Sequence, residues 1–279
     1  MIWVLGAICF WAAAWWVNAR LANGPQSLVT RIAVPLIFGF TLLVLWEGLV
    51  RGLGVSPVIL PAPSLVAQTF IGSTDILWTD FQQTVIKGAL RGFLMGTVAA
   101  IAIAILIDRS AFLTRGLLPI GNFGAALPIG GTAPSLVSWF GFDWHSKAAV
   151  VVVMVFFPIL VNTVQGLRET DRLSRDLMRT YAAGYGQTLL KLRLPAAMPF
   201  IFNGLKIAAT LALIGAIVAE YFGSPTRGMG FRISTGVGAL AIDLVWAEIA
   251  LAALAGTAFY GLVAWIEKRV TFWHPSQRG

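Results

Sequence analysis

Seven long apolar stretches dominate this sequence, and each is close in length to the thickness of a bilayer. They cover residues 1–17, 32–50, 84–107, 116–140, 148–166, 199–222 and 243–265. A helix that crosses the hydrocarbon core needs roughly 20 mostly apolar residues. Of the 279 residues, 58% are hydrophobic and 11% are charged, whereas soluble domains average roughly 45–50% and about 25%. The pattern predicts an all-α, polytopic membrane protein with about seven transmembrane helices.

Several other classes of protein do not fit these residues. A membrane β-barrel needs segments of about ten residues that alternate between apolar and polar, but the stretches here are longer and apolar on every side. One cysteine, Cys9, and two histidines, His145 and His274, leave no cluster with the spacing of metal ligands. The sequence also lacks the glycine-rich loop that binds the phosphates of ATP. We therefore expect this chain to bind no cofactor or metal of its own.

The basic residues are distributed unevenly among the connections between spans. The formal net charge is +8, from 20 Lys and Arg against 12 Asp and Glu. Such an excess can indicate nucleic-acid binding, but here its placement follows membrane topology instead. With the loop 168–193 on the cytoplasmic side, most Lys and Arg residues fall on that side, as the positive-inside rule requires. The amino terminus then lies outside, and residues 1–17 are interpreted as a retained helix rather than a signal peptide.

The chain divides by composition into four parts. Residues 1–31 hold an extra N-terminal transmembrane helix and a basic loop. Residues 32–83 hold the second span and an external segment, rich in proline, that is expected to lie along the interface. Residues 84–270 form the core of the protein, with one long cytoplasmic loop at 167–198, and residues 271–279 form a cytoplasmic tail.

Small residues recur along one face of the third span. They are Gly88, Gly92, Gly96, Ala100 and Ala104, which follow one another at intervals of four. Such a face lets another helix approach closely. That helix can belong to the same subunit or to a second subunit in a dimer, and the spacing does not choose between them.

The fourth span, 116–140, is broken by prolines and glycines. Each proline removes a backbone donor, and the freed carbonyls are tolerated at membrane depth only where protein or a wet cavity covers them. Interrupted helices often line transport pathways; the alternative is a kinked helix that serves packing alone. We expect a pathway lined by residues of this span and by one acid of the sixth, namely Asn122, Pro128, Thr132, Pro134, Ser138 and Glu220.

Four ionisable residues lie inside apolar windows: Glu47, Lys206, Glu220 and Glu248. An ionisable group at the centre of an inserted helix costs at least about 2.5 kcal/mol unless it meets a partner or water. Lys206 lies close enough to the cytoplasmic end of its span to extend towards it. Glu220 can pair with Arg227 or Arg232, face an external protein, or border the pathway.

The loop 167–198 has the pattern of two short helices. One face of the first carries Leu173, Leu177, Met178 and Tyr181, and another carries Arg172, Arg175 and Arg179. Thr170 can cap this helix and Asp171 favours its first turn, while Gly184 and Gly186 interrupt the pattern. A helix this short is marginal in water. Its apolar stripe therefore needs a partner, which can be another protein, the spans of this chain or lipid headgroups.

The same loop is similar to the EAA loop of binding-protein-dependent ABC transporter permeases. That pattern runs E-A-A, three residues, Gly, nine residues, an aliphatic residue, one residue and Leu-Pro. Counting back from Leu194 and Pro195 places Ala182 on the glycine, and Asp176, Leu177 and Met178 on E-A-A. The acid is kept, but the two alanines and the glycine are not. Because alanine disfavours a left-handed turn, Gly184 or Gly186 is expected to supply that turn.

The segments on either side of the loop resemble the nitrate/sulfonate/taurine-type permeases more closely. They are ALPIGGTAPSLVSWFGFDWHSKAAVVVVMVFFPILVNTVQGLRETD and LPAAMPFIFNGLKIAATLALIGAIVAEYFG, with an earlier LPAPS and a closing FWH, so the resemblance runs from about residue 57 to 274. It implies a type I ABC permease with six core helices in a bacterial inner membrane, and it leaves the first helix outside. It also implies two ATPase subunits that bind ATP and Mg, a second permease subunit of the same or a different sequence, an external solute-binding protein, and no nucleic acid.

In such an assembly the first helix of the loop is implied to couple the permease to the ATPase. Its apolar stripe fills a groove on the ATPase, and the charges beside the stripe make rim contacts that fix its register. The residues expected to take part are Arg172, Leu173, Arg175, Asp176, Leu177, Met178, Arg179, Tyr181, Ala182, Gly184, Gly186, Leu194 and Pro195.

The leading interpretation is the permease subunit of an ATP-driven importer, which is not itself an enzyme. Related transporters carry sulfonates, nitrate, bicarbonate, aromatic acids, pyrimidine precursors or riboflavin, and the FWH ending favours a pyrimidine-like or riboflavin-like solute. The alternative is a secondary transporter driven by an ion gradient, which explains the broken fourth span but leaves the structured loop without a role. A membrane-embedded enzyme is less consistent with the sequence, since no G-x-S-x-G or H-E-x-x-H motif occurs.

Overall fold

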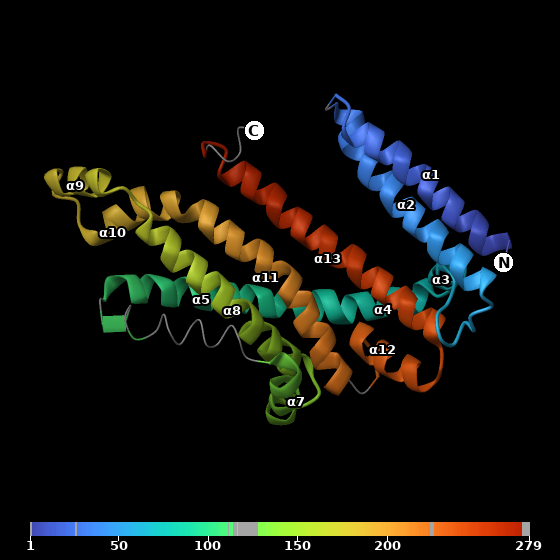
Figure 1. Ribbon diagram of the computed structural model, residues 1–279. Helices are drawn as coiled ribbons and strands as arrows, with labels where there is room; N and C mark the ends of the chain where they lie inside the picture. The colour runs from blue at the N-terminus through green and yellow to red at the C-terminus, as the bar shows by residue number, and fades with distance from the viewer. Residues whose placement is uncertain are drawn as a thin grey trace. The chain divides into compact units, whose positions relative to one another are not determined.

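The computed structural model describes residues 2–25, 27–110, 112–113, 116, 128–223 and 226–274. Every regular element in these ranges is helical, so the all-α prediction is confirmed. The elements are α1 (Ile2–Ala22), α2 (Leu28–Gly52), α3 (Pro63–Gly72), α4 (Thr74–Phe81), the π-helical η1 (Gln82–Leu90), α5 (Arg91–Arg109), α7 (Ile129–Phe140), α8 (Trp144–Arg168), α9 (Arg172–Thr180), α10 (Tyr185–Thr188), the π-helical η2 (Leu189–Arg193), α11 (Leu194–Gly223), α12 (Met229–Gly238) and α13 (Ile242–Val270) (Figure 1).

Six helical runs in the described part of the chain are long and apolar enough to cross a membrane. They are Trp3–Ala22, Leu28–Gly52, Thr74–Arg109, Trp144–Arg168, Tyr185–Gly223 and Ile242–Val270. The chain is therefore a multi-pass membrane protein, and six of the seven predicted spans coincide with these runs in whole or in large part. The third run begins well before residue 84, because α4 and η1 continue into α5. Of the predicted span 116–140, most of the first half lies outside the described residues, and the remainder forms the 12-residue α7.

Two compact units make up the chain, and the first comprises residues 1–77 and 233–250. In this unit α1 and α2 form an antiparallel pair (Figure 1). The N-terminus of α2 is capped by Ser27, whose Oγ accepts a hydrogen bond from the Thr30 amide at 3.2 Å. Gly48 faces Ala7 so closely that a side chain on Gly48 would overlap the Ala7 methyl group. The two helices therefore touch through small residues.

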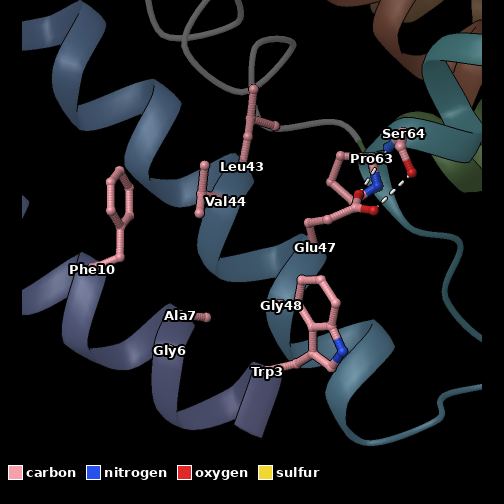
Figure 2. Close-up of a pocket in the computed structure, with 10 residues that line it drawn as sticks. All are labelled: Trp3, Gly6, Ala7, Phe10, Leu43, Val44, Glu47, Gly48, Pro63 and Ser64. Carbon is pink, nitrogen blue, oxygen red and sulfur yellow. Dashed lines mark hydrogen bonds between the residues drawn. The ribbon is translucent and has the colours of Figure 1, made fainter.

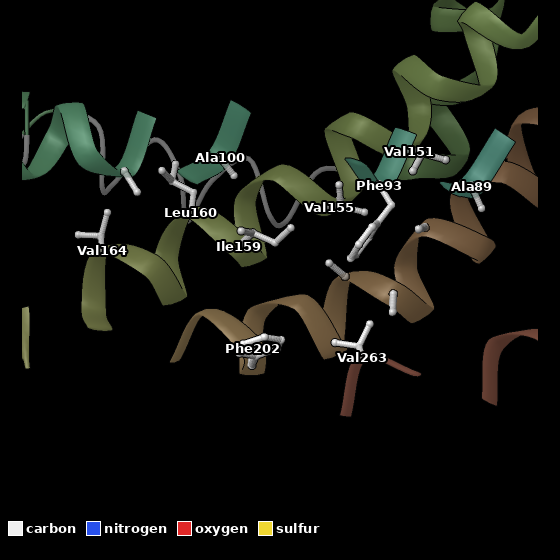
Figure 3. Packing of buried hydrophobic residues seen from close by; sticks show 14 of the residues in the cluster. Ala89, Phe93, Ala100, Val151, Val155, Ile159, Leu160, Val164, Phe202 and Val263 are labelled. Carbon is white, nitrogen blue, oxygen red and sulfur yellow. The ribbon is translucent and has the colours of Figure 1, made fainter. Parts of the chain in front are cut away.

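The second unit comprises residues 78–232 and 251–279 and holds the main hydrophobic core. This core lies between α5, α8 and α11, with Phe93 and Val155 among its buried members (Figure 3). A Cβ atom on Gly92 would lie 2.5 Å from Val151 Cβ of α8, and one on Gly96 would overlap Val155. The small face of the third span thus packs against α8 of the same chain, which decides between the two alternatives left open by the sequence.

The short helix α7 also belongs to the second unit. Its residues Ala133 and Val137 are buried, and Ala133 packs with Val150 of α8 and Ala219 of α11. Gly223 has no room for a side chain because Val137 lies against it. The helix ends at Gly141, whose φ of 79° is accessible mainly to glycine. One face of α7 is therefore fixed against the bundle.

Candidate coupling site and buried ion pairs

The loop between α8 and α11 forms the two short helices that the sequence predicted, α9 and α10. Asp171 occupies the N-cap position of α9 but forms no side-chain capping hydrogen bond. Thr170, which we expected to cap the helix, is buried, and its Oγ1 has no hydrogen-bond partner among the described residues. The capping prediction for Thr170 is therefore wrong, because the residue lies one position too early and turns into the protein.

The apolar stripe of α9 points away from the rest of the chain. Leu173 is 77% exposed, Leu177 is 56% exposed and Tyr181 is 77% exposed, while Met178 is half-buried. Exposing this much apolar surface to water is unfavourable by roughly 25 cal/mol per Å². Among the described residues, none of the chain's spans covers the three most exposed side chains. The stripe is thus available to another molecule.

Charged side chains surround this stripe. Arg172 and Arg179 are exposed and Arg175 is half-buried. Arg179 pairs with Asp176 at 3.4 Å, and both side chains are largely exposed to solvent. A surface pair of this kind contributes little to stability, typically about 0–1 kcal/mol. These charges are therefore free to form contacts at the edge of an interface.

The left-handed turn after α9 is at Ala182, not at either glycine. Ala182 has a φ of 52°, whereas Gly184 has a φ of −68° and Gly186 lies inside α10. The Ala182 amide donates to the Arg179 carbonyl at 2.9 Å and the Ala183 amide donates to the Met178 carbonyl at 3.0 Å. These two bonds form a Schellman motif, in which glycine usually takes the left-handed position. Our expectation for Gly184 or Gly186 is therefore wrong.

Leu194 and Pro195 open α11 directly after the π-helical segment η2. Both are half-buried, and Leu194 packs against a small core that includes Leu167 and Ile201. Because η2 runs directly into α11, the missing amide of Pro195 leaves one carbonyl of the preceding turn without a helical partner. The leucine and proline thus join the loop to the bundle.

The residues predicted to line a pathway are placed as follows. Asn122 lies outside the described residues. Pro128 precedes α7, and α7 carries Thr132, Pro134 and Ser138. Pro128 and Ser138 are exposed, whereas Thr132 and Pro134 are half-buried. Ser138 Oγ donates to the Pro134 carbonyl at 2.9 Å, a local bond within one turn of α7.

Glu220 lies in a closed polar cluster. Its side chain is 0% exposed and pairs with the Lys147 ammonium of α8, which is 1% exposed, at 2.9 Å. Thr84 Oγ1 of η1 donates to Glu220 Oε2 at 2.6 Å, and the Gly230 amide donates to the same oxygen at 3.2 Å. Among the described residues the carboxylate is fully enclosed, and its ion-pair partner is Lys147 rather than Arg227 or Arg232. Lys147 could not be predicted as this partner, because the two residues are 73 positions apart in the chain.

A second buried acid holds the segment that follows α11. Asp80 accepts a hydrogen bond from the Gly228 amide at 2.7 Å and pairs with Arg232 Nε at 2.9 Å. The Met229 amide donates to Thr84 Oγ1 at 2.8 Å. Residues 228–232 are therefore bound to α4 and η1 by backbone and side-chain contacts together.

Lys206 and Glu47 also have partners inside the chain. Lys206 Nζ pairs with Glu267 of α13 at 2.8 Å, a partner that the sequence did not predict, and its extension towards the cytoplasmic side stays a prediction. Glu47 pairs with Arg51 and accepts hydrogen bonds from the Ser64 amide at 2.9 Å and from Ser64 Oγ at 2.7 Å. Glu47 lines an apolar groove of about 760 Å³ between α1 and α2, and Figure 2 shows its carboxylate turned towards Ser64. Its negative charge also complements the N-terminus of α3.

Comparison with known proteins identifies the family. The profile of the binding-protein-dependent transport system inner membrane component matches residues 92–272. The chain belongs to this family. A probable ABC transporter permease of Haemophilus influenzae is 34% identical over 243 residues, which cover 86% of this permease and 97% of the relative.

Two further relatives are named for their solutes. The formylaminopyrimidine transport permease ThiX of Halalkalibacterium halodurans is 31% identical, with 87% of this permease and 96% of the relative covered. The riboflavin transport system permease RibX of Chloroflexus aurantiacus is 30% identical, with 84% and 88% covered. The predicted resemblance to ABC permeases is thus confirmed, and the permease is a transporter component rather than a catalytic enzyme.

Proposed function

We propose that this permease is the transmembrane subunit of an ATP-driven importer and that α9 is the element to which a separate ATPase binds. The observation that carries the proposal is the exposed apolar stripe of α9. It lies in a chain that belongs to a family of transport permeases. A short helix of this kind is held in shape by its partner surface. The stripe would fill a groove on the ATPase, and Arg175, Asp176 and Arg179 would contact the rim.

The proposed assembly contains two ATPase subunits, which bind ATP and Mg, and a second permease subunit. It lies in a bacterial inner membrane and receives its solute from an external binding protein. The names of the relatives support a small organic solute related to pyrimidines or flavins. Calorimetry of the binding protein with formylaminopyrimidine and with riboflavin tests this choice, and binding of neither compound would contradict it.

The coupling proposal is tested by the double variant Leu177→Asp and Tyr181→Asp. Two carboxylates in an apolar groove lose their hydration without gaining partners, so we expect the ATPase to be lost from the purified complex. The measurement is the amount of ATPase recovered with a tagged permease from solubilised membranes. The matched control is Leu177→Met with Tyr181→Phe, which keeps the stripe apolar and is expected to retain the ATPase.

Recovery of normal amounts of ATPase with the aspartate variant would reject α9 as the binding element. Uptake into vesicles separates the proposal from an ion-driven transporter. Uptake that stops when ATP is removed and survives an uncoupler supports the importer. Uptake that continues without ATP but collapses with the uncoupler contradicts it.

A further inference from the structure

A buried ion pair lies at the base of the loop that carries α9. The Arg193 guanidinium, in η2, donates to both carboxylate oxygens of Asp108, each at 2.6 Å. The side chains of Arg193 and Asp108 are 12% and 6% exposed. Two parallel bonds between a planar guanidinium and a carboxylate fix orientation as well as distance. This pair therefore holds η2 firmly against the end of α5.

The same arginine also holds the end of α8. Its Nε and one terminal nitrogen donate to the Leu167 carbonyl at 3.1 and 2.8 Å. Leu167 lies in the last turn of α8, where carbonyls have no partner inside the helix. One side chain thus closes the loop 168–192 by joining the residue before it to the residue after it.

A third contact brings α10 into this joint. Tyr185 Oη donates to Asp108 Oδ2 at 3.2 Å. Beneath the polar groups, Leu167, Leu189, Ala197 and Ile201 form a small buried core. Asp108 lies near the C-terminus of α5, where a negative charge is unfavourable to the helix dipole. Its placement there is explained by the partners that it binds.

We propose that Arg193 and Asp108 are positioning residues that transmit movement of α9 to the transmembrane helices. The inference rests on the proposed function, because it takes α9 to be the point where the ATPase acts. A loop with an open base would bend when α9 is displaced. A loop whose two ends are fixed to each other and to α5 carries α5, α8 and α11 with it.

The test is hydrogen–deuterium exchange of the permease in complex with its ATPase in nanodiscs, with and without a non-hydrolysable ATP analogue. In the wild type we expect the analogue to change exchange in the loop 168–192 and also in the distant halves of α5 and α8. In Asp108→Asn we expect the change to remain in the loop and to fall about tenfold in the distant halves, a size typical of single substitutions that alter coupling. Arg193→Lys keeps the charge but loses the planar fork and should give an intermediate result.

The matched control is Glu267→Gln, which breaks an ion pair of similar burial between α11 and α13. This variant should transmit the change as the wild type does. If Glu267→Gln and Asp108→Asn reduce the exchange change in the distant halves equally, the effect is a general loss of stability and the inference is overturned. An unreduced change in Asp108→Asn would overturn it too. Absence of the ATPase from the wild-type complex would reject the proposed function itself, whereas the exchange results above reject only the inference about Arg193 and Asp108.

Discussion

Ala182 shows how one residue can depart from a family pattern without moving the turn that the pattern encodes. The alignment with the EAA loop places Ala182 on the family's glycine, and the backbone still adopts the left-handed conformation there. The hydrogen bonds that end α9 require this geometry, so they override the preference of alanine. The neighbouring glycines are consequently not needed for the turn.

Replacing Ala182 by glycine should therefore stabilise the end of α9. Removing the clash of a Cβ atom in the left-handed region gains about 0.5–1 kcal/mol after the added freedom of the unfolded chain is subtracted. We expect amide exchange in residues 172–183 to slow by roughly two- to fivefold. Ala183→Gly is the control, since the φ of Ala183 is not positive, and it should speed exchange. Faster exchange in Ala182→Gly would contradict the assignment.

Lys147 is the residue on which the buried cluster around Glu220 depends. Lys147→Met leaves a carboxylate buried without its counter-ion, so the free energy of unfolding should fall by about 3–5 kcal/mol. The double variant with Glu220→Gln removes both charges and should recover most of that loss. Unfolding in a mixed-detergent titration measures both. A double variant as unstable as the single one would show that the pair itself contributes the stability.

Close contact between α5 and α8 depends on glycine rather than on specific polar groups. Gly96→Val should destabilise the permease by about 1–3 kcal/mol, because its side chain would overlap Val155. Combining it with Val155→Ala should restore part of the loss. Gly39→Ala in α2 is the control, since nothing lies within 4 Å of its added methyl group, and it should leave the thermal midpoint unchanged or higher. Equal effects of the two substitutions would refute the packing explanation.

Each of the two π-helical segments supplies one residue to a polar contact with another helix. Thr84 of η1 contacts Glu220, and Arg193 of η2 contacts Asp108. An extra residue in a turn shifts the face on which a side chain emerges, and such segments occur frequently at functional positions. Periodicity of 3.6 residues does not reveal them, so the sequence could not place either side chain correctly.

For the molecule as a whole, the sequence predicted what depends on local composition. Apolar length located six spans in the described part of the chain, and the amphipathic pattern located α9. It did not predict partners that are distant in the chain, such as Lys147 for Glu220 or Glu267 for Lys206. Those pairings depend on how helices pack, which a single sequence does not record. The roles assigned to the residues of the loop 167–198 and of α7 stay predictions.

The closed base of the loop 168–192 also bears on how permeases of this kind can diversify. Because Arg193 fixes both ends of the loop to α5 and α8, substitutions inside the loop leave its attachment to these helices unchanged, so its exposed surface can vary while movement is still transmitted. The loop 168–192 can therefore change in sequence, or be exchanged by recombination, as the ATPase subunits change. The fit between a permease and its ATPase would then evolve separately from the selectivity for the solute.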